Sequence, residues 1–215
     1  MLQLSAINTP TLELLNQLML AEEFKNMRLA GGTALALQLG HRKSIDLDFF
    51  GVIDFDHIYT SNPFSSFKQV TTLKRSKNIN IFSINNIKVD FVNYSYPWLH
   101  EPIIENSIRL AATEDIAAMK LAAITGKGSK KDFIDLNFLL QTHTLQELLD
   151  FYKKKYHDGS EFLVLKSLTY FDDANTELGI EMLKDIPWTH IKAHLLHTVT
   201  EYNHNIQWKP IAHYP

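Results

Sequence analysis

The sequence predicts an α/β (α+β) fold, with a mixed sheet and helices in its first half and a helical region in its second half. Two observations lead to this prediction. Short segments with strand-like alternation, interrupted by a glycine pair, occur up to Pro97, and beyond it the apolar residues recur at helical spacing. We therefore expect a core domain over residues 1–105 and a helical domain over residues 106–215, the second completing the binding site of the first.

Composition and charge narrow the class of protein. The chain has 215 residues, of which 45% are apolar and 21% charged, as is usual for a globular protein. A net charge of −3 excludes a globally basic nucleic-acid coat, although the stretch 120–131 holds four lysines and no acid. The absence of cysteine excludes disulfides and thiolate metal sites. Because there is no signal peptide and no apolar run of ~18–20 residues, we expect a cytoplasmic protein with no membrane segment.

Hydrophobic periodicity predicts the elements in order. In the first half these are a helix over 11–24, a strand over 27–30, a helix over 33–39, and strands over 44–50, 70–73, 79–84 and 87–92. Thr9 or Thr11 is the expected cap of the first helix, Gly40 ends the second, and Asn85-Asn86 forms a hairpin turn. The second half is expected to hold helices over 113–125, 130–141, 145–156, 161–171 and 188–202.

The strand expected over 44–50 carries two carboxylates on one face. Alternate side chains of a strand point the same way, so Asp46 and Asp48 lie together, about 7 Å apart at their Cα atoms, with apolar residues such as Ile45 on the other face. Asp90, expected on a neighbouring strand, is a third candidate ligand. Carboxylate oxygens are the ligands that Mg²⁺ prefers, and three unpaired carboxylates repel one another. We predict that Asp46, Asp48 and Asp90 are catalytic and hold Mg²⁺, as a pair of ions, with Mn²⁺ as a substitute.

The Gly31-Gly32-Thr33 turn supplies a phosphate site. Glycines let the backbone approach a phosphate, the helix that follows offers free N–H groups, and the Thr33 hydroxyl adds a hydrogen bond. Metal-bound carboxylates opposite such a turn suit nucleotidyl transfer, in which an oxygen attacks the α-phosphorus of a nucleoside triphosphate and pyrophosphate leaves. Asp90 is also expected to favour deprotonation of the attacking hydroxyl.

Other polar residues near the turn have plainer interpretations as well. His41 and Arg42 are candidates for binding the nucleotide phosphates, but they equally suit a turn between helix and strand. Asp54 and Asp56 are an alternative source of carboxylates. They follow the expected strand and are therefore disfavoured as ligands.

The second half contains a cluster of charged residues that suits a phosphate-facing wall. The lysines of this wall are Lys120, Lys127, Lys130 and Lys131. Asp132 and Asp135 are three residues apart and share one helical face. They are expected to orient Lys120 or Lys131, or to accept a proton, and the sequence leaves this choice open.

Three late histidines and several aromatic residues are weaker candidates. His190, His194 and His197 share a helical face and suggest zinc, but no fourth ligand is evident. The aromatic residues Trp98, Trp188, Trp208 and Tyr214 are interpreted as core or interface residues, not as platforms for base stacking.

Two runs of sequence together resemble a known family. The first is LAGGTALAL at 29–37 followed by HRKSIDLDFF at 41–50, and the second is AMKLAA at 118–123 with KDFIDL at 131–136. They resemble the bacterial nucleotidyltransferase family that includes the AbiEii and AbiGii abortive-infection toxins. The resemblance covers residues 25 to 142, and nothing from about Thr144 onward can be matched.

The resemblance implies a polymerase-β-like nucleotidyltransferase core, Mg²⁺ and a nucleoside triphosphate donor. It also implies that Lys120 is catalytic and contacts the triphosphate, and that Asp132 or Asp135 is needed for activity. Family members often act as toxins paired with an antitoxin that regulates transcription, and some modify tRNA ends. Lys127, the further expected nucleotide contact, stands where we expect Arg, so a bidentate phosphate contact is lost there.

The favoured prediction is a Mg²⁺-dependent nucleotidyltransferase that transfers a nucleoside monophosphate to RNA, with tRNA as one candidate, or to protein. It would be the toxin of a type IV toxin–antitoxin, or abortive-infection, system. The alternative is a catalytically inactive nucleotidyltransferase fold that serves as a binding or regulatory module, against which the intact Asp46, Asp48, Asp90 and Lys120 set argues. A phosphotransferase with an aspartyl nucleophile is disfavoured because Phe50 stands where that class commonly has Thr.

Overall fold

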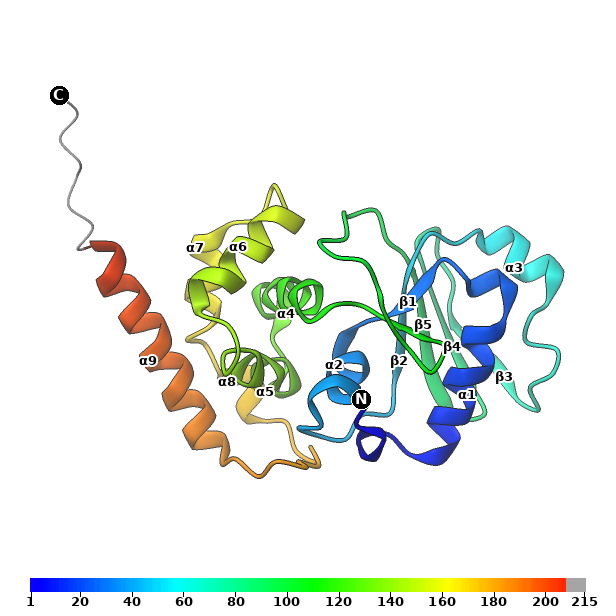
Figure 1. Ribbon diagram of the computed structural model, residues 1–215, viewed down its shortest axis with the longest axis horizontal. Coiled ribbons are helices and arrows are strands. Elements are labelled where there is room, and N and C mark those ends of the chain that lie inside the picture. Colours follow the sequence, from blue (N-terminus) through cyan, green and yellow to red (C-terminus); the bar gives the residue numbers. More distant parts are fainter. Residues whose placement is uncertain (208–215) are drawn as a thin grey trace. The chain divides into compact units, whose positions relative to one another are not determined.

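The computed structural model describes residues 1–207 and is shown in Figure 1. Its residues divide into two units: residues 1–116 with 180–184, and residues 117–179 with the chain from Asp185 onward. Helix α4 (Thr113–Lys127) begins in the first unit and continues in the second. The functional partition expected at residue 105 stays a prediction, and Trp208 and Tyr214 lie outside the described residues.

The first unit is built on a seven-stranded mixed sheet with the order β3-β4-β5-β2-β1-β7-β6. The β2–β5 and β1–β7 pairs are parallel, and the other neighbours are antiparallel. The strands are β1 (Met27–Leu29), β2 (Leu47–Gly51), β3 (Val70–Lys74), β4 (Ile79–Ile84), β5 (Ile87–Asn93), β6 (Ile103–Glu105) and β7 (Ile108–Leu110). The helices are α1 (Thr9–Leu20), α2 (Gly31–Leu39) and α3 (Phe55–Ser61), with 3₁₀ turns at Leu4–Ala6 and Glu22–Phe24. This mixed sheet and the helices that follow it confirm the predicted fold class.

The ends of the first helices differ in part from the prediction. Helix α1 is capped by Asn8, whose side chain accepts a hydrogen bond from the Thr11 N–H at 2.8 Å, so neither Thr9 nor Thr11 is the cap. The helix ends at Leu20 instead of continuing to residue 24. Gly40 ends α2 with a φ of 61°, as predicted, because glycine adopts this left-handed conformation without a Cβ clash.

The hairpin between β4 and β5 has the predicted turn. Asn85 and Asn86 have φ angles of 50° and 67°, and two consecutive left-handed residues match the twist of the paired strands. The sequence did not predict α3, β6 or β7. With seven, three and three residues, these elements are too short to show a periodicity.

The two faces of the central strands differ in burial. On one face of β2 and β5, Phe49 and Phe91 are buried and stack at 5.3 Å between ring centroids, and Phe24 stacks on Phe91 at 4.5 Å. The other face carries the half-buried Asp48 and Asp90. The apolar core therefore holds the strands from one side and leaves the carboxylates partly open to solvent on the other.

The second unit is helical. After α4 it contains α5 (Lys130–Leu139), α6 (Leu145–Lys155), α7 (Glu161–Ser167), α8 (Asp172–Asn175) and α9 (Trp188–Gln207). Ser129 and Asp132 form a capping box that starts α5, and Thr144 and Glu147 form one that starts α6. Helix α9 packs against α5 and α6 (Figure 1). The helix predicted over 161–171 is wrong at its end, because α7 stops at Ser167 and the short α8 follows.

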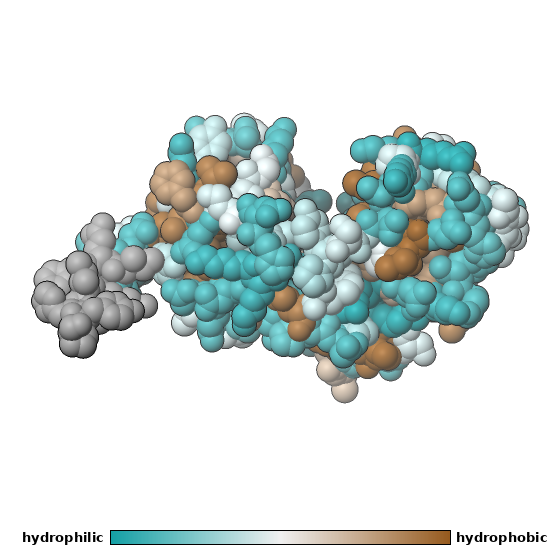
Figure 2. Space-filling model, turned by 90° about the horizontal axis from the view of Figure 1, so that it is seen from above, coloured by the Kyte–Doolittle hydropathy of each residue, from teal (hydrophilic) through white to brown (hydrophobic). Residues whose placement is uncertain are grey.

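The face drawn in Figure 2 is mainly hydrophilic, and apolar side chains appear in small separate patches. Exposed apolar residues occur in both units, among them Leu20, Val52, Phe162 and Leu178. Within residues 1–207, no helix combines the length and the apolar character that crossing a membrane requires.

Candidate active site

Strands β2 and β5 bring two of the predicted carboxylates together. The strands pair in parallel, with Asp48 directly opposite Asp90. Neighbouring strands lie about 4.8 Å apart, and paired side chains point to the same face of the sheet. The two carboxylates therefore stand side by side, and the expectation that Asp90 lies on a strand next to that of Asp48 is confirmed.

Gly31 lies against the Asp48 carboxylate. Its φ of +64° is left-handed, and a Cβ added to it would come within 2.7 Å of Asp48 Oδ2. The main chain is tied at the same place, since the Ala30 N–H donates to the Asp48 carbonyl oxygen at 2.9 Å. Because Gly31 is the first residue of α2, the first N–H groups of this helix have no acceptor within the helix itself.

Asp46 precedes β2, which begins at Leu47, so the prediction that Asp46 lies within the strand is wrong. Ile45, expected on the buried face, is 58% exposed. The Thr33 hydroxyl donates to the main-chain oxygen of Asp46 and lies 2.8 Å from Ser44 Oγ. Thr33 is itself buried, so in this structure its hydroxyl fixes the segment that carries Asp46. A contact between Thr33 and a phosphate stays a prediction.

Lys88, which the sequence did not single out, interacts with all three aspartates. Its ammonium lies 2.8 Å from each carboxylate oxygen of Asp90. Burial lowers the pKa of Lys88, but the hydrogen bond and charge of Asp90, and the charges of Asp48 and Asp46, outweigh burial and raise it. The charges of Asp46 and Asp48 therefore act on the Lys88 ammonium, while Asp90 pairs with it directly. The alternation of Lys88 with Asp90 along β5 is the sequence signal that identifies it.

The carboxylates provide the chemistry of a site for a hard divalent cation, because carboxylate oxygens are preferred ligands of Mg²⁺. Within residues 1–207, however, no three side chains of metal-binding type are arranged to hold a metal ion. Lys88 provides the positive charge that offsets Asp90. A metal ion held jointly by Asp46, Asp48 and Asp90 therefore requires their carboxylates to draw closer and the Lys88 ammonium to give way.

His41 and Arg42 are buried, with exposed fractions of 0% and 2%. Arg42 forms a β-bridge with Met182, and the His41 carbonyl accepts a hydrogen bond from the Leu183 N–H at 2.9 Å. The Lys43 N–H likewise donates to the carbonyl of the same returning segment. In this structure these residues bind segment 180–184 of the first unit, and their contact with a nucleotide stays a prediction.

Asp54 has a structural role that accounts for it. Its side chain caps α3 and accepts hydrogen bonds from the N–H groups of Asp56 and His57 at 3.0 and 3.2 Å. Asp56 is exposed in the first turn of the same helix, where a negative charge is favourable. Both acids are therefore explained by the start of α3.

Lys120 forms a buried ion-pair cluster in the second unit. Its ammonium lies 2.8 Å from Asp132 Oδ1 and 2.6 Å from Asp135 Oδ2. Asp135 is fully buried and Lys120 is 7% exposed. The second oxygen of Asp132 accepts hydrogen bonds from the Ser129 N–H and hydroxyl at 3.0 and 2.7 Å. Of the alternatives that the sequence left open, both acids contact Lys120, whereas Lys131 is exposed.

The remaining lysines of the predicted wall have separate environments. Lys127 is exposed in the last turn of α4. Lys130 donates from its N–H and ammonium to Glu177 at 3.0 and 3.1 Å, and its ammonium lies 5.3 Å from the centroid of the Trp188 ring. The four lysines therefore do not form one continuous group within the second unit.

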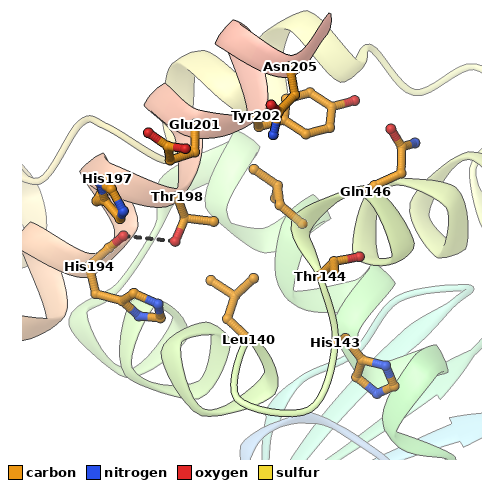
Figure 3. A pocket seen from close by; sticks show the side chains of 11 residues that line it. Leu140, His143, Thr144, Gln146, His194, His197, Thr198, Glu201, Tyr202 and Asn205 are labelled. Carbon is orange, nitrogen blue, oxygen red and sulfur yellow. Dashed lines mark hydrogen bonds between the residues drawn. The ribbon is translucent and has the colours of Figure 1, made fainter.

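A cavity of about 420 Å³ lies within the second unit (Figure 3). Residues of α9 line one wall, and residues at the end of α5 and the start of α6 line the other. His194 lies at this cavity and its Nδ1 is 2.8 Å from Asn137 Oδ1. His197 also lines the cavity, but no metal-holding group occurs among residues 1–207, so the zinc interpretation gains no support.

Solved structures share this fold, a mixed sheet followed by helices. JHP933 from Helicobacter pylori has a TM-score of 0.57 at 18% identity, with 94% of this chain and 98% of that chain covered. The antibiotic-resistance factor ANT(2'')-Ia has a TM-score of 0.53 at 14% identity, and the match covers 67% of this chain and 90% of that chain.

Sequence comparisons identify the family of this chain. The model of the nucleotidyl transferase AbiEii toxin, of type IV toxin–antitoxin systems, matches residues 13–209. This chain belongs to that family and is a nucleotidyltransferase. An uncharacterized protein of Aquifex aeolicus (strain VF5) is 40% identical over 185 residues, which are 82% of this chain and 88% of that protein. The family match extends well beyond residue 142, where the resemblance of the motifs ends.

Proposed function

We propose that this enzyme transfers a nucleoside monophosphate from a nucleoside triphosphate to RNA, with tRNA as one candidate, or to protein, in a Mg²⁺-dependent reaction. In the cell it would act as the toxin of a type IV toxin–antitoxin system and be paired with an antitoxin that regulates transcription. The observation that carries this proposal is the pairing of Asp48 with Asp90 across β2 and β5, directly beside the Gly31 turn.

Asp46, Asp48 and Asp90 are the residues that would hold the Mg²⁺ pair or a substituting Mn²⁺. When bound, the metal neutralises charge on the phosphoryl oxygens and on the leaving group. Lys88 would hold Asp90 in place before the donor arrives, since it contacts both oxygens of that carboxylate.

In the proposed transfer, one bond to phosphorus forms and another breaks. The oxygen of an acceptor hydroxyl bonds to the α-phosphorus, and the bond between that phosphorus and the oxygen bridging to the β-phosphorus breaks. Pyrophosphate leaves, and the hydroxyl proton passes to the Asp90 carboxylate. The N–H groups at Gly31 and Gly32 would bind the phosphates that face the start of α2.

Lys120 remains the proposed contact for the triphosphate in the second unit. Its ion pairs with Asp132 and Asp135 would fix the position of its ammonium, which makes the two acids positioning residues. Lys127, His41, Arg42 and Thr33 stay proposed nucleotide contacts. For His41 and Arg42 this role requires a change from their present burial.

The test is label transfer from each of the four α-labelled triphosphates, with Mg²⁺, to total RNA and to a protein extract. Asp48→Ala should lower the transfer rate by on the order of 10³-fold or more, because it removes a metal carboxylate. Asp56→Ala is the matched control, because Asp56 is an exposed acid of the same unit outside the proposed site. Transfer by the wild type that survives Asp48→Ala would refute the proposed site. No transfer to any acceptor would favour the inactive binding or regulatory module.

A further inference from the structure

Aromatic rings continue the half-buried face of the sheet beyond the carboxylates. Phe50 follows Asp48 on the same face of β2, and its ring meets that of Tyr94 edge-on at 5.2 Å between centroids. The Tyr94 ring in turn lies 5.2 Å from that of Trp98 and 5.5 Å from that of Tyr96. These four residues, Phe50, Tyr94, Tyr96 and Trp98, are here called the aromatic platform. Trp98, interpreted from the sequence as a core or interface residue, is half-buried and belongs to this group.

The loop over residues 94–100, which carries Tyr94, Tyr96 and Trp98, is fixed at its end by hydrogen bonds. The fully buried carboxylate of Asp115 accepts hydrogen bonds from the N–H groups of Leu99 and His100 at 2.9 and 3.2 Å. Arg28 donates to the His100 carbonyl at 2.9 Å, and its guanidinium carbon lies 4.0 Å from the centroid of the Trp98 ring. The rings are therefore positioned in advance, and a planar ligand would not have to order them.

The platform is partly accessible and carries a positive charge. Tyr96 is 50% exposed, and the side chains of Phe50, Tyr94 and Trp98 are half-buried. Aromatic faces next to an arginine suit nucleic acid, because the rings stack on bases and the guanidinium attracts phosphates. A protein acceptor presents a hydroxyl but no run of planar bases, so it makes less use of these rings.

The position of the platform along the strands separates it from the donor phosphates. Because β1 is antiparallel to β2, with Arg28 opposite Phe50, Gly31 lies toward the start of β2 and the platform toward its end. Asp48 lies between them. In an in-line displacement the attacking oxygen and the leaving group are on opposite sides of the phosphorus. With the phosphates at the glycine turn, the platform is on the side from which the acceptor attacks.

We infer that the aromatic platform binds unpaired bases of a single-stranded RNA acceptor and presents a hydroxyl of that RNA to the site at Asp48 and Asp90. This inference rests on the proposed nucleotidyl transfer and names its acceptor class. Recognition by stacking is tolerant of sequence, so the platform selects unpaired RNA and not a particular base.

The experiment measures RNA binding by the full chain without triphosphate or metal. The probe is a short single-stranded RNA with 2-aminopurine at its 3′ end, whose fluorescence falls when the base stacks. Tyr96→Ala should weaken binding by about 10- to 100-fold and abolish the quenching, whereas Tyr96→Phe, which keeps the ring, should retain both. Tyr170→Ala is the matched control, since Tyr170 is 57% exposed and lies outside the platform.

Several results would overturn the inference. These are no RNA binding by the wild type, equal binding by Tyr96→Ala and Tyr170→Ala, equal affinity for the same RNA as a duplex, or label transfer to protein alone. Asp48→Ala separates the two proposals, because it should abolish transfer and leave RNA binding intact. If RNA binding quenches the 2-aminopurine fluorescence but no nucleotide is transferred, the proposed function is refuted and the binding role of the platform is supported. Transfer to RNA with an unchanged KM for RNA in Tyr96→Ala would do the reverse.

Discussion

Replacing Gly31 with alanine should have two separate effects: backbone strain lowers the stability of the fold, and displacement of the Asp48 carboxylate lowers the rate of transfer. Gly31 has a φ of +64°, a conformation that costs an L-residue about 1–2 kcal/mol. The new Cβ would come within 2.7 Å of Asp48 Oδ2. That oxygen is at the end of a rotatable side chain, so the carboxylate can turn away at little further cost in stability. We therefore expect a loss of about 1–2 kcal/mol in the free energy of unfolding.

The loss of activity should exceed what this change in stability explains. Turning the Asp48 carboxylate moves a proposed metal ligand by about the displacement that, in catalytic sites, costs on the order of 10²-fold in rate. A protein that is a further 1–2 kcal/mol less stable still remains mostly folded if its stability is of the usual size. The measured rate per folded molecule should thus fall about a hundredfold in Gly31→Ala.

Gly179→Ala is the matched control for this experiment. Gly179 has a φ of +80°, and a Cβ added to it would meet nothing within 4 Å. It should lose a similar 1–2 kcal/mol of stability and keep its transfer rate. Urea unfolding gives the stabilities, and label transfer to RNA or protein gives the rates. Equal loss of rate in the two variants would refute the reasoning, as would a further loss when Gly31→Ala is added to Asp48→Ala.

Two further predictions concern the lysines that pair with acids. Folding raises the pKa of Lys88, so its stabilising effect is complete below its usual value of 10.5 and is lost as the pH rises above it. Lys88→Met should cost under about 1 kcal/mol of stability near neutral pH, because the Lys88 side chain is 43% exposed. Mg²⁺ should raise the melting temperature of this variant more than that of the wild type. Equal shifts in the two proteins would argue against competition between Lys88 and the metal. Lys120→Met should cost about 3–5 kcal/mol in urea unfolding, because it leaves the buried Asp135 carboxylate without its cation. The exposed Lys131→Met should stay within about 0.5 kcal/mol, and a similarly small effect for Lys120→Met would contradict this account.

The elements that were predictable are those whose signal is local. Helix α6 has its capping box and apolar spacing within its own residues, and the β4–β5 hairpin has its two asparagines at the turn. The predictions that were wrong concern residues whose position depends on contacts with distant parts of the chain. The main-chain oxygen of Asp46 accepts a hydrogen bond from the Thr33 hydroxyl, and β2 begins at Leu47, three residues after the predicted start at Ser44. His41 and Arg42 are buried by residues 180–184, which return from far along the chain.

The sequence by itself determined which chemical groups the candidate site offers. These are carboxylates at alternate positions, a glycine pair before a helix, a lysine in one later helix, and two acids that share a face of the next helix. Only the tertiary structure decided how these groups combine. It set β5 beside β2 with Asp90 opposite Asp48 and put Lys88 among the carboxylates. It also gave Lys120 both Asp132 and Asp135 as partners. The physical reason is that strand partners, register and ion pairs between helices depend on burial and backbone pairing between distant segments, which no local stretch of sequence contains.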